Sequence, residues 1–460
     1  EADLVIGARS AIFAPLPDLG LIVVDEEHES SYKQDTSPRY HARDVAVMRG
    51  KLLDATVILG SATPSLETLH NANIGKYGLL ELPRRATAHG LPQVHVVNLD
   101  GRFYSPSGKG LISHDLDRMI HRELKRGTQS ILYLNRRGFT TYLHCTECGC
   151  VLNCDECDVS LTFHHGENVL RCHYCDLKEM VPTVCPDCNS REIRHSGVGT
   201  EKVVAEISRR FPEARILRLD RDTVRNHQQL KKALASFSRG DYDILVGTQM
   251  VAKGHDFPGV NLVGILLADT GLHFPDFRAA ERTWQLLTQV AGRAGRGEHQ
   301  GLAIIQTFSA EHNAVRFAAS GDHEEFCRLE LENRKVLGYP PFGRLVKILL
   351  SGKNEEAVEK EAGRIGELLR QASSPARRQE GSGSLSELKK TGAGALASRP
   401  RILGPAPAPL NKLQGKFRIQ ILIKSPTSAV NQRLLEKVEA RLKTRRGVDL
   451  FIDVDPQSML

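Results

Sequence analysis

Near the start of the chain, Leu21-Ile22-Val23-Val24-Asp25-Glu26-Glu27-His28 is an apolar, β-branched run that ends in adjacent carboxylates. Such a run, which begins here at Leu19, predicts a strand of a parallel sheet with polar chemistry at its carboxyl end. Phosphoryl transfer uses one carboxylate to hold Mg²⁺ and another to orient the attacking water, and Asp25 suits the metal while Glu26 suits the water. The alternative is a strand that ends in a solvated acidic turn.

Further apolar runs of strand length alternate with amphipathic helical stretches. The predicted strands are Thr56–Leu59, Ile131–Leu134, Arg215–Leu219, Ile244–Val246 and Val263–Leu267, and helices are expected over Glu201–Phe211 and Gln229–Phe237. Strands that alternate with helices predict α/β domains built on parallel sheets. The alternation breaks between Leu143 and Arg191, so this cysteine-rich block is interpreted as an insertion.

The character of the sequence changes after Gly338. Strand-like and helix-like runs there predict a small α+β domain, with strands Leu345–Leu350, Arg418–Ile423 and Asp449–Val454 and helices Glu355–Leu369 and Arg433–Leu442. Ser373–Pro400 is poor in apolar residues and predicts a disordered insertion. We therefore expect three domains: part of a first lobe at 1–108, a second lobe at 109–337 with the insertion at 144–190, and the α+β domain at 338–460.

Composition narrows the class of protein. The 460 residues are 40% hydrophobic and 25% charged with a net charge of +7, which fits nucleic acid as a partner but also small anions. No apolar run approaches the roughly 18 residues that span a bilayer, and Ala2–Ala14 lacks the layout of a secretion signal. The first residue is Glu1 rather than Met, so we expect the natural start to lie upstream.

Eight of the ten cysteines form four Cys-x-x-Cys pairs: Cys145/Cys148, Cys154/Cys157, Cys172/Cys175 and Cys185/Cys188. In a large chain without a secretion signal, such pairs indicate metal rather than disulfides. Two pairs complete a closed tetrahedron, so the eight thiolates predict two structural zinc ions, with redox chemistry as the alternative. Spacing admits more than one pairing, although the separation of the two inner pairs is close to that of zinc ribbons and leaves the outer two for the second ion.

A short motif of small residues, Gly60-Ser61-Ala62-Thr63, follows the second predicted strand. Hydroxyl residues at a strand end can link a nucleotide-sensing sheet to a moving neighbour. The alternative is a helix cap, with Thr63 or Ser65 as the N-cap and Pro64 in the first turn.

Two further motifs lie downstream. Val246-Gly247-Thr248-Gln249 and then Lys253-Gly254-His255-Asp256 form a glycine-containing loop after a strand. In Gln289-Val290-Ala291-Gly292-Arg293-Ala294-Gly295-Arg296, two arginines three apart share one face of a helix end, and the glycines permit close backbone approach. Guanidinium groups there suit a γ-phosphate, whereas the alternative is a solvated basic helix end.

The order of these motifs resembles that of superfamily 2 helicases, in which two RecA-like lobes clasp ATP. The chain is further similar to the PriA family of primosomal helicases (primosomal protein N-prime) over nearly its whole length outside Ser373–Pro400. The resemblance lies in Ser30–Gln34, Arg39–Asp44, Leu134–Gly138, Lys253–Pro258, Pro275–Arg282 and Asp453–Leu460.

The resemblance implies an ATP-driven 3′-to-5′ DNA helicase that recognises stalled or repaired forks and helps to reload the replicative helicase. It implies Mg²⁺–ATP and zinc as cofactors, and forked and single-stranded DNA, single-stranded-DNA-binding protein and other primosome proteins as partners. It further implies a monomer in the bacterial cytoplasm, associated with the nucleoid. A non-catalytic zinc scaffold is the alternative from another class, and an RNA helicase or a duplex translocase is a third.

The resemblance also assigns roles to residues. Catalysis is expected of Asp25, Glu26, Gln289, Arg293 and Arg296, with Asp25 and Glu26 facing Arg293 and Arg296 across one nucleotide cleft. Nucleotide sensing or coupling is expected of Glu27, His28, Ser61, Ala62, Thr63, Gly254 and Asp256. Ser31–Arg43 corresponds to an aromatic-rich loop that couples DNA binding to hydrolysis: Tyr32, Tyr40 and His41 would stack on bases, and Lys33, Arg39 and Arg43 would meet phosphates. The family also implies the nested pairing of the cysteines.

One expected element is missing from the sequence. A Gly-x-x-x-x-Gly-Lys-Ser/Thr loop, which cradles phosphates in motors of this kind, does not occur. In the family it lies upstream, together with amino-terminal DNA-binding modules. We therefore expect the chain as written to show little or no ATPase activity.

Overall fold

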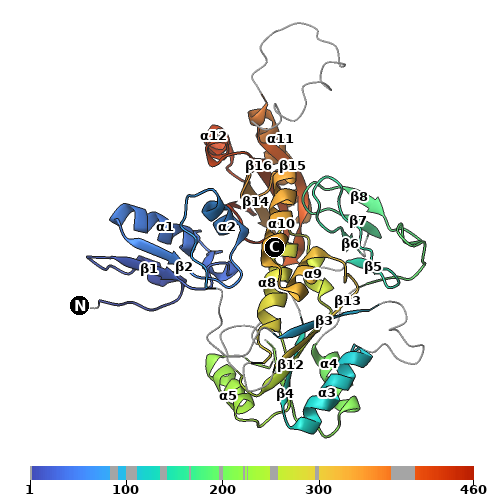
Figure 1. Cartoon of the computed structure of the whole chain (residues 1–460). Coiled ribbons are helices and arrows are strands. Elements are labelled where there is room, and N and C mark those ends of the chain that lie inside the picture. Colours follow the sequence, from blue (N-terminus) through green and yellow to red (C-terminus); the bar gives the residue numbers. More distant parts are fainter. Residues whose placement is uncertain are drawn as a thin grey trace. The chain divides into compact units, whose positions relative to one another are not determined.

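The computed structural model describes residues 3–82, 92–99, 111–134, 142–164, 167–195, 200–220, 223–224, 226–248, 257–295, 300–374 and 399–459. It divides into two compact units, one formed by Glu1–Leu79 with Asn333–Leu460 and the other by Leu80–Glu332 (Figure 1). Most of the predicted insertion at 373–400 lies outside the described residues, so that prediction is not tested. Among the described residues, no helix is both long enough and apolar enough to span a bilayer.

The second unit is built on a six-stranded parallel sheet with the strand order β10-β11-β4-β12-β13-β3. Its strands are β3 (Gln93–Asn98), β4 (Gln129–Leu134), β10 (Ile216–Leu219), β11 (Ile244–Gly247), β12 (Val260–Leu266) and β13 (Leu302–Thr307). β4, β11 and β12 are buried along their whole lengths, as predicted for strands covered on both faces. β3 pairs with β13, so residues 93–98 belong to this sheet and not, as predicted, to the first lobe.

Helices cover the sheet because their apolar residues recur on one face. α3 (His114–Arg126) is capped at its start by Ser113, whose hydroxyl accepts from the N–H of Leu116 at 3.2 Å. It is followed by Gly127 in a left-handed conformation, which ends the helix. Leu116 and Ile120 pack with Val203 and Ile207 of α4 (Thr200–Arg210) onto alternate residues of the strands. α5 (His227–Ser238) lies against β10, and α8 (Ala279–Ala291) packs against β12, β13 and α9 (Asn313–Ser320).

The cysteine-rich insertion forms two small antiparallel sheets within the same unit (green strands in Figure 1). β5 (Leu143–Cys145) pairs with β9 (Ile193–His195), so the insertion is closed where it leaves and rejoins the lobe. β6 (Thr162–His164), β7 (Val169–Arg171) and β8 (Lys178–Met180) form the second sheet.

In the first unit, the amino-terminal segment contains a two-stranded parallel sheet. β1 (Leu21–Val24) pairs in register with β2 (Thr56–Leu59). α1 (Ala42–Leu53) packs on them through Ala46, and α2 (Leu66–Asn73) follows β2. The prediction that β1 is a buried strand is only half right, because Ile22 and Val24 are buried while Leu21 and Val23 are exposed.

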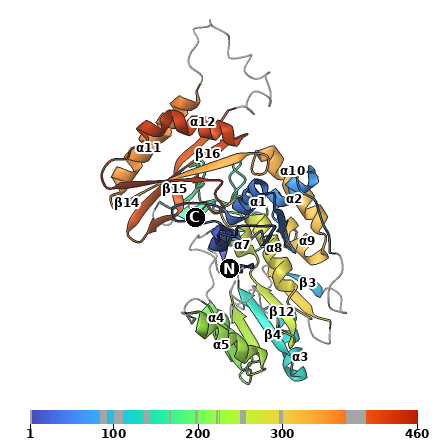
Figure 2. The same ribbon diagram turned by 90° about the vertical axis from the view of Figure 1, so that its left-hand side faces the viewer.

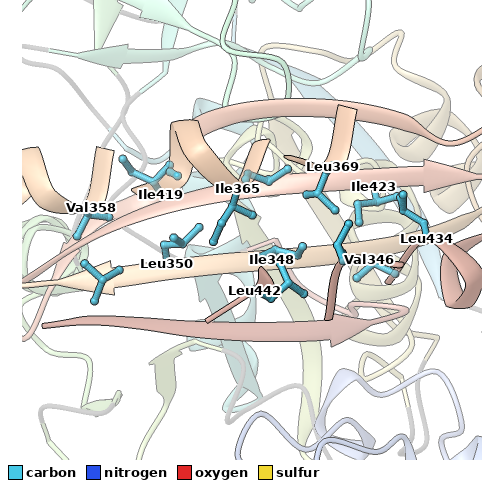
Figure 3. Close-up of a cluster of buried hydrophobic side chains, with 14 residues drawn as sticks. Val346, Ile348, Leu350, Val358, Ile365, Leu369, Ile419, Ile423, Leu434 and Leu442 are labelled. Carbon is cyan, nitrogen blue, oxygen red and sulfur yellow. The ribbon is translucent and has the colours of Figure 1, made fainter. Parts of the chain in front are cut away.

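The carboxyl-terminal part of this unit is a four-stranded antiparallel sheet with the order β15-β16-β14-β17 (Figure 2). Its strands are β14 (Arg344–Gly352), β15 (Arg401–Leu413), β16 (Lys416–Ser425) and β17 (Val448–Val454). α11 (Glu355–Ser373) begins at Asn354, and its buried residues Val358, Ala362, Ile365 and Leu369 recur at helical spacing. They meet Val346, Ile348, Ile421 and Ile423 of the sheet and Leu434 of α12 (Ser428–Val438) in one apolar core (Figure 3).

β15 was not predicted, because its sequence contains Pro405, Pro407 and Pro409. Proline cannot donate to a ladder and is tolerated at sheet edges and at irregularities. β15 is an edge strand, and its register with β16 shifts between Leu403 and Ala406 and again between Pro407 and Lys412.

Candidate active site and metal centres

The carboxylates that follow β1 are open to solvent. Asp25 is exposed, the side chain of Glu26 is 47% exposed, and the N–H of Glu26 donates to Oδ1 of Asp25 at 2.9 Å. Glu26 has a φ of 47°, an unfavourable backbone conformation for a residue with a side chain. Such strain is concentrated at functional sites. Two accessible carboxylates held in one turn are able to bind a divalent cation and a water molecule.

Glu27 has the opposite environment, although it is the next residue. It is 1% exposed, and its carboxylate accepts from the N–H of Ser65 at 2.6 Å, from Oγ of Ser65 at 3.0 Å and from Oγ1 of Thr68 at 2.9 Å. A guanidinium N–H of Arg43 donates to it at 3.0 Å. These four bonds satisfy a buried charge that would otherwise destabilise the fold.

His28 joins the same two segments at a second point. Its Nδ1 lies 2.7 Å from Oγ of Ser61, and that hydroxyl also accepts from the N–H of Thr63 at 3.0 Å. The segment Ser61–Thr68 is therefore held at one end by His28 and at the other by Glu27. The motif Ser61-Ala62-Thr63 thus lies directly against the carboxylate turn, as coupling requires.

The structure settles which residue caps α2. Ser65 is the N-cap, since its hydroxyl accepts from the N–H of Thr68. Pro64 precedes the cap, which corrects the expectation that Pro64 lies in the first helical turn. Thr63 is fully buried.

The predicted DNA-binding loop, Ser31–Arg43, folds back on itself. Lys33 and His41 form an isolated antiparallel bridge, and the N–H of Gln34 donates to the carbonyl of Tyr40 at 2.8 Å. The hydroxyl of Tyr32 donates to the backbone carbonyl of Asp25 at 2.6 Å. Burial, followed by the carboxylates of Asp25, Glu29 and Glu26, raises the pKa of Tyr32. The loop is therefore fixed to the carboxylate turn at its start.

The side chains of this loop differ in their access to solvent. Arg39 and Tyr40 are half-buried, and Tyr40 packs edge-on against Phe13. Lys33 and His41 are each 7% exposed and Arg43 is 8% exposed. Burial by itself lowers the pKa of Arg43, but Asp44 and Glu27 raise it above its usual range, so its charge belongs to this internal network. Lys33 and Arg43 are thus committed to protein partners, whereas Arg39 and Tyr40 are accessible.

Gln289 and Arg293 lie near the end of α8. Gln289 is on the helix and half-buried, and Arg293 follows it in a turn after the helix ends at Ala291. Gly295 has a φ of 70°, and a Cβ there would lie 2.2 Å from the backbone nitrogen of Gly301. Close backbone approach at this glycine was predicted. Arg296, Gly254 and Asp256 lie outside the described residues.

The eight paired cysteines gather into two groups of four, Cys145, Cys148, Cys185 and Cys188 in one and Cys154, Cys157, Cys172 and Cys175 in the other. Within each group all sulfur atoms lie within 4.8 Å of one another. Sγ of Cys145 lies 3.6 Å from that of Cys188, and Sγ of Cys148 lies 3.5 Å from that of Cys185. A zinc–sulfur bond of about 2.3 Å gives a tetrahedron edge of about 3.8 Å, so both groups fit zinc. The arrangement is the nested one.

The four pairs share one backbone conformation. In each, the N–H of the first cysteine donates to the carbonyl five residues later, and the N–H of the residue after the second cysteine donates back to the first cysteine, at 2.7–3.1 Å. The residue after the second cysteine is left-handed in every case, with φ between 50° and 76°, at Gly149, Asp158, Asp176 and Asn189. Glycine, asparagine and aspartate tolerate this conformation, so the sequence carried a further signal that we did not use.

Two of these turns attach the insertion to the α/β lobe of its unit, which sequence reasoning also missed. A Cβ on Gly149 would lie 2.1 Å from the carbonyl oxygen of Phe308, so the first turn packs directly on the backbone after β13. The hydroxyl of Tyr174, within the third turn, accepts from the N–H of Phe277 at 3.2 Å. Phe277 lies two residues before the start of α8, in the segment Pro275–Arg282.

Three family models match the chain. Residues 188–298 match the helicase conserved C-terminal domain, 154–179 the PriA DNA helicase Cys-rich region domain, and 335–457 the primosomal protein N C-terminal domain. A parallel α/β lobe with a zinc-binding cysteine-rich module places the chain among proteins with a helicase fold.

The particular family follows from relatives whose similarity covers 99–100% of this chain. The chain is 39% identical to the replication restart protein PriA of Bacillus subtilis over 100% of the chain and 54% of that protein. It is 41% identical to that of Synechocystis, over 99% of the chain and 53% of the relative, and 41% identical to that of Treponema pallidum, over 99% and 65%. The chain belongs to the PriA family, and it spans about half the length of the first of these relatives.

Proposed function

We propose that the chain supplies the carboxylate and arginine motifs and the zinc module of an ATP-dependent 3′-to-5′ DNA helicase that restarts replication. Its substrates are stalled or repaired forks, and it reloads the replicative helicase there with single-stranded-DNA-binding protein and other primosome proteins. It acts as a monomer in the bacterial cytoplasm. The observation that carries the proposal is the accessible, strained Asp25-Glu26 turn in a chain about 40% identical throughout to replication restart proteins.

Each residue has a role in the proposed reaction. Bound Mg²⁺–ATP supplies the phosphoryl group and much of the charge neutralisation. Asp25 holds the metal, and Glu26 orients the attacking water and takes its proton. Gln289, Arg293 and Arg296 bind the phosphate and offset its developing charge. Glu27 and His28 keep the turn in place through Ser65 and Ser61, with Ala62 and Thr63 between them. Gly254 and Asp256 are assigned to nucleotide coupling, and Tyr32, Lys33, Arg39, Tyr40, His41 and Arg43 to the loop that couples DNA binding.

The zinc module has a structural role in this proposal. Two closed four-cysteine sites leave no open position for a reacting ligand, so they hold the module's fold. We propose two zinc ions per chain, one in each group. The domain assignment that accompanies the proposal is the carboxyl-terminal part of the first motor lobe, a second lobe with the zinc insertion, and a carboxyl-terminal α+β domain.

The test uses the whole gene product and the variant Glu26→Gln, which keeps the shape of the side chain and removes its basicity. DNA-stimulated phosphate release should fall by about 100- to 10,000-fold, the usual contribution of a general base. Asp54→Asn is the matched control, because Asp54 is an exposed acid in the same unit whose left-handed backbone asparagine tolerates. It should leave the rate unchanged.

Strand displacement on forked DNA and on the corresponding RNA then decides the substrate. Unwinding of DNA with a 3′ tail supports the proposal. Phosphate release that needs neither Glu26 nor Arg296 would make the chain a zinc-containing scaffold instead. ATP-dependent movement without strand separation would make it a translocase.

A further inference from the structure

Lys33 is a buried lysine whose partners lie at the other end of the chain. Its ammonium group lies 2.9 Å from Oδ1 of Asp453, and it donates to the carbonyl of Val454 at 2.8 Å and to that of Asp455 at 3.4 Å. The ammonium group therefore has one carboxylate oxygen and two backbone carbonyls within 3.4 Å. Lysine is almost never fully buried unless it is paired, so at 7% exposure this residue is held by these contacts.

Lys33 contacts β17, which is a strand at the edge of its sheet. β17 pairs with β14, and among the described strands it has no other neighbour. The carbonyl of Val454 therefore has an ammonium group in place of a neighbouring strand. Arg39 adds a second contact from the same loop, because its guanidinium group lies 5.2 Å from the centre of the Phe451 ring on β17.

The opposite end of this connection is the candidate active site. Tyr32, the residue before Lys33, donates from its hydroxyl to the backbone carbonyl of Asp25 at 2.6 Å. Arg43, at the far end of the loop, donates to Glu27. Two adjacent residues thus join the carboxylate turn to β17, and the loop is closed on the turn at both of its ends.

We propose that Lys33 is a positioning residue that transmits the state of the carboxyl-terminal domain to Asp25 and Glu26. A shift of β17 pulls on Lys33, and Tyr32 carries the shift to the backbone of Asp25. Through this connection the carboxyl-terminal domain sets how strongly DNA stimulates ATP hydrolysis. This inference rests on the proposed function and assigns to Lys33 a protein partner rather than a DNA phosphate.

The test compares Lys33→Met and Asp453→Asn in the whole gene product. Each should lower the DNA-stimulated kcat by about 5- to 150-fold, the usual range for coupling between two sites. In Asp453→Asn, ATP hydrolysis without DNA and the KM for ATP should stay within twofold, which a general loss of structure would not allow. The two changes together should lower the rate no further than either alone, because they break one connection.

Lys416→Met is the matched control. Lys416 forms an ion pair with Asp449 at 2.6 Å on the same strand β17, but the pair is exposed and does not reach the loop. It should leave DNA stimulation unchanged. Lys33→Arg keeps the charge and should retain most of the stimulation, and hydrogen exchange of the amides of residues 32–43 should quicken in Asp453→Asn.

Three outcomes overturn the inference. If DNA stimulates ATP hydrolysis as strongly in Lys33→Met and Asp453→Asn as in the parent protein, the proposed connection does not operate. A defect in Lys33→Met with a normal Asp453→Asn, accompanied by weaker DNA affinity, means that Lys33 contacts DNA. If the amides of residues 32–43 exchange as slowly in Asp453→Asn as in the parent protein, the loop does not depend on β17. This result can be obtained even where Lys33→Met fails to fold. Absence of any DNA-dependent hydrolysis in the parent protein is a different result, since it defeats the proposed function itself.

Discussion

The carboxylate of Glu27 accepts the backbone N–H of Ser65 at 2.6 Å, although the two residues are 38 positions apart in sequence. The same carboxylate holds Arg43. One buried side chain thereby fixes the positions of β1, α1 and α2 next to the exposed pair Asp25 and Glu26. The residue that supports this turn is thus one that takes no direct part in the proposed chemistry.

Glu27→Gln should destabilise the fold. The amide retains the size of the carboxylate but removes the buried counter-charge of Arg43 and leaves the exposed Asp44 as its carboxylate partner, so the loss should reach up to about 3–5 kcal/mol. Urea unfolding followed by circular dichroism measures the loss. The exposed variant Asp54→Asn should change the free energy of unfolding by less than about 0.5 kcal/mol. Equal effects of the two variants would show that Glu27 does not carry the network.

Acid should weaken this unit through His41. Burial, followed by the charge of Arg43, lowers the pKa of His41 from its ordinary value near 6.5 to about 4. Between about pH 4 and 6.5 the unfolded chain therefore binds more protons than the folded protein. As far as His41 is concerned, the free energy of unfolding is highest above about pH 6.5 and falls as the pH drops toward 4. The shift is worth about 3 kcal/mol.

The comparison variant for this effect is His41→Gln, which does not titrate. The free energy of unfolding of the parent should fall more steeply than that of His41→Gln from pH 6.5 to 4.5. Parallel curves would mean that His41 is already protonated in the folded protein or that its environment is open to water.

Gly149→Ala should detach the zinc module from its sheet. A Cβ at Gly149 would lie 2.1 Å from the carbonyl oxygen of Phe308, and the φ of 76° adds backbone strain. Gly127→Ala is the control for strain alone, because Gly127 has a φ of 66° with no atom within 4 Å of a Cβ. Gly127→Ala should cost about 1–2 kcal/mol and Gly149→Ala clearly more. Thermal melting and proteolysis of the module measure both, and similar results would contradict the close packing.

Removing one thiolate from each of the two outer pairs should remove one zinc ion. The nested groups predict that Cys148→Ser with Cys185→Ser leaves the ion held by Cys154, Cys157, Cys172 and Cys175. Elemental analysis should give about two ions per chain for the parent and about one for the variant. Cys150→Ser, outside both groups, should keep two. We further expect the part of the module around the lost ion to unfold while the α/β lobe keeps its own melting transition, since the bound metal contributes about 10–16 kcal/mol to such modules.

Short-range patterns in the sequence predicted much of the fold. β2 has the predicted bounds, and β4, β11 and β12 lie where apolar runs of strand length placed them. β15 was missed because its three prolines are compatible with a strand only at a sheet edge, and whether a strand is at an edge depends on its neighbours. β3 was not predicted as a strand, and its residues were included in the first lobe, because its partner β13 is about 200 residues away in sequence.

Features that are local in the chain could be predicted without a structure. The Asp25-Glu26 turn and each Cys-x-x-Cys pair lie within a few residues, and that spacing limits what they can bind. Which side chains pair with each other became clear from the three-dimensional structure alone. Lys33 and Arg43 carry the positive charge that phosphate-binding residues have, yet they are buried and form ion pairs with Asp453 and Glu27. The cost of burying an unpaired charge selects such partners, and distance along the chain does not reveal them.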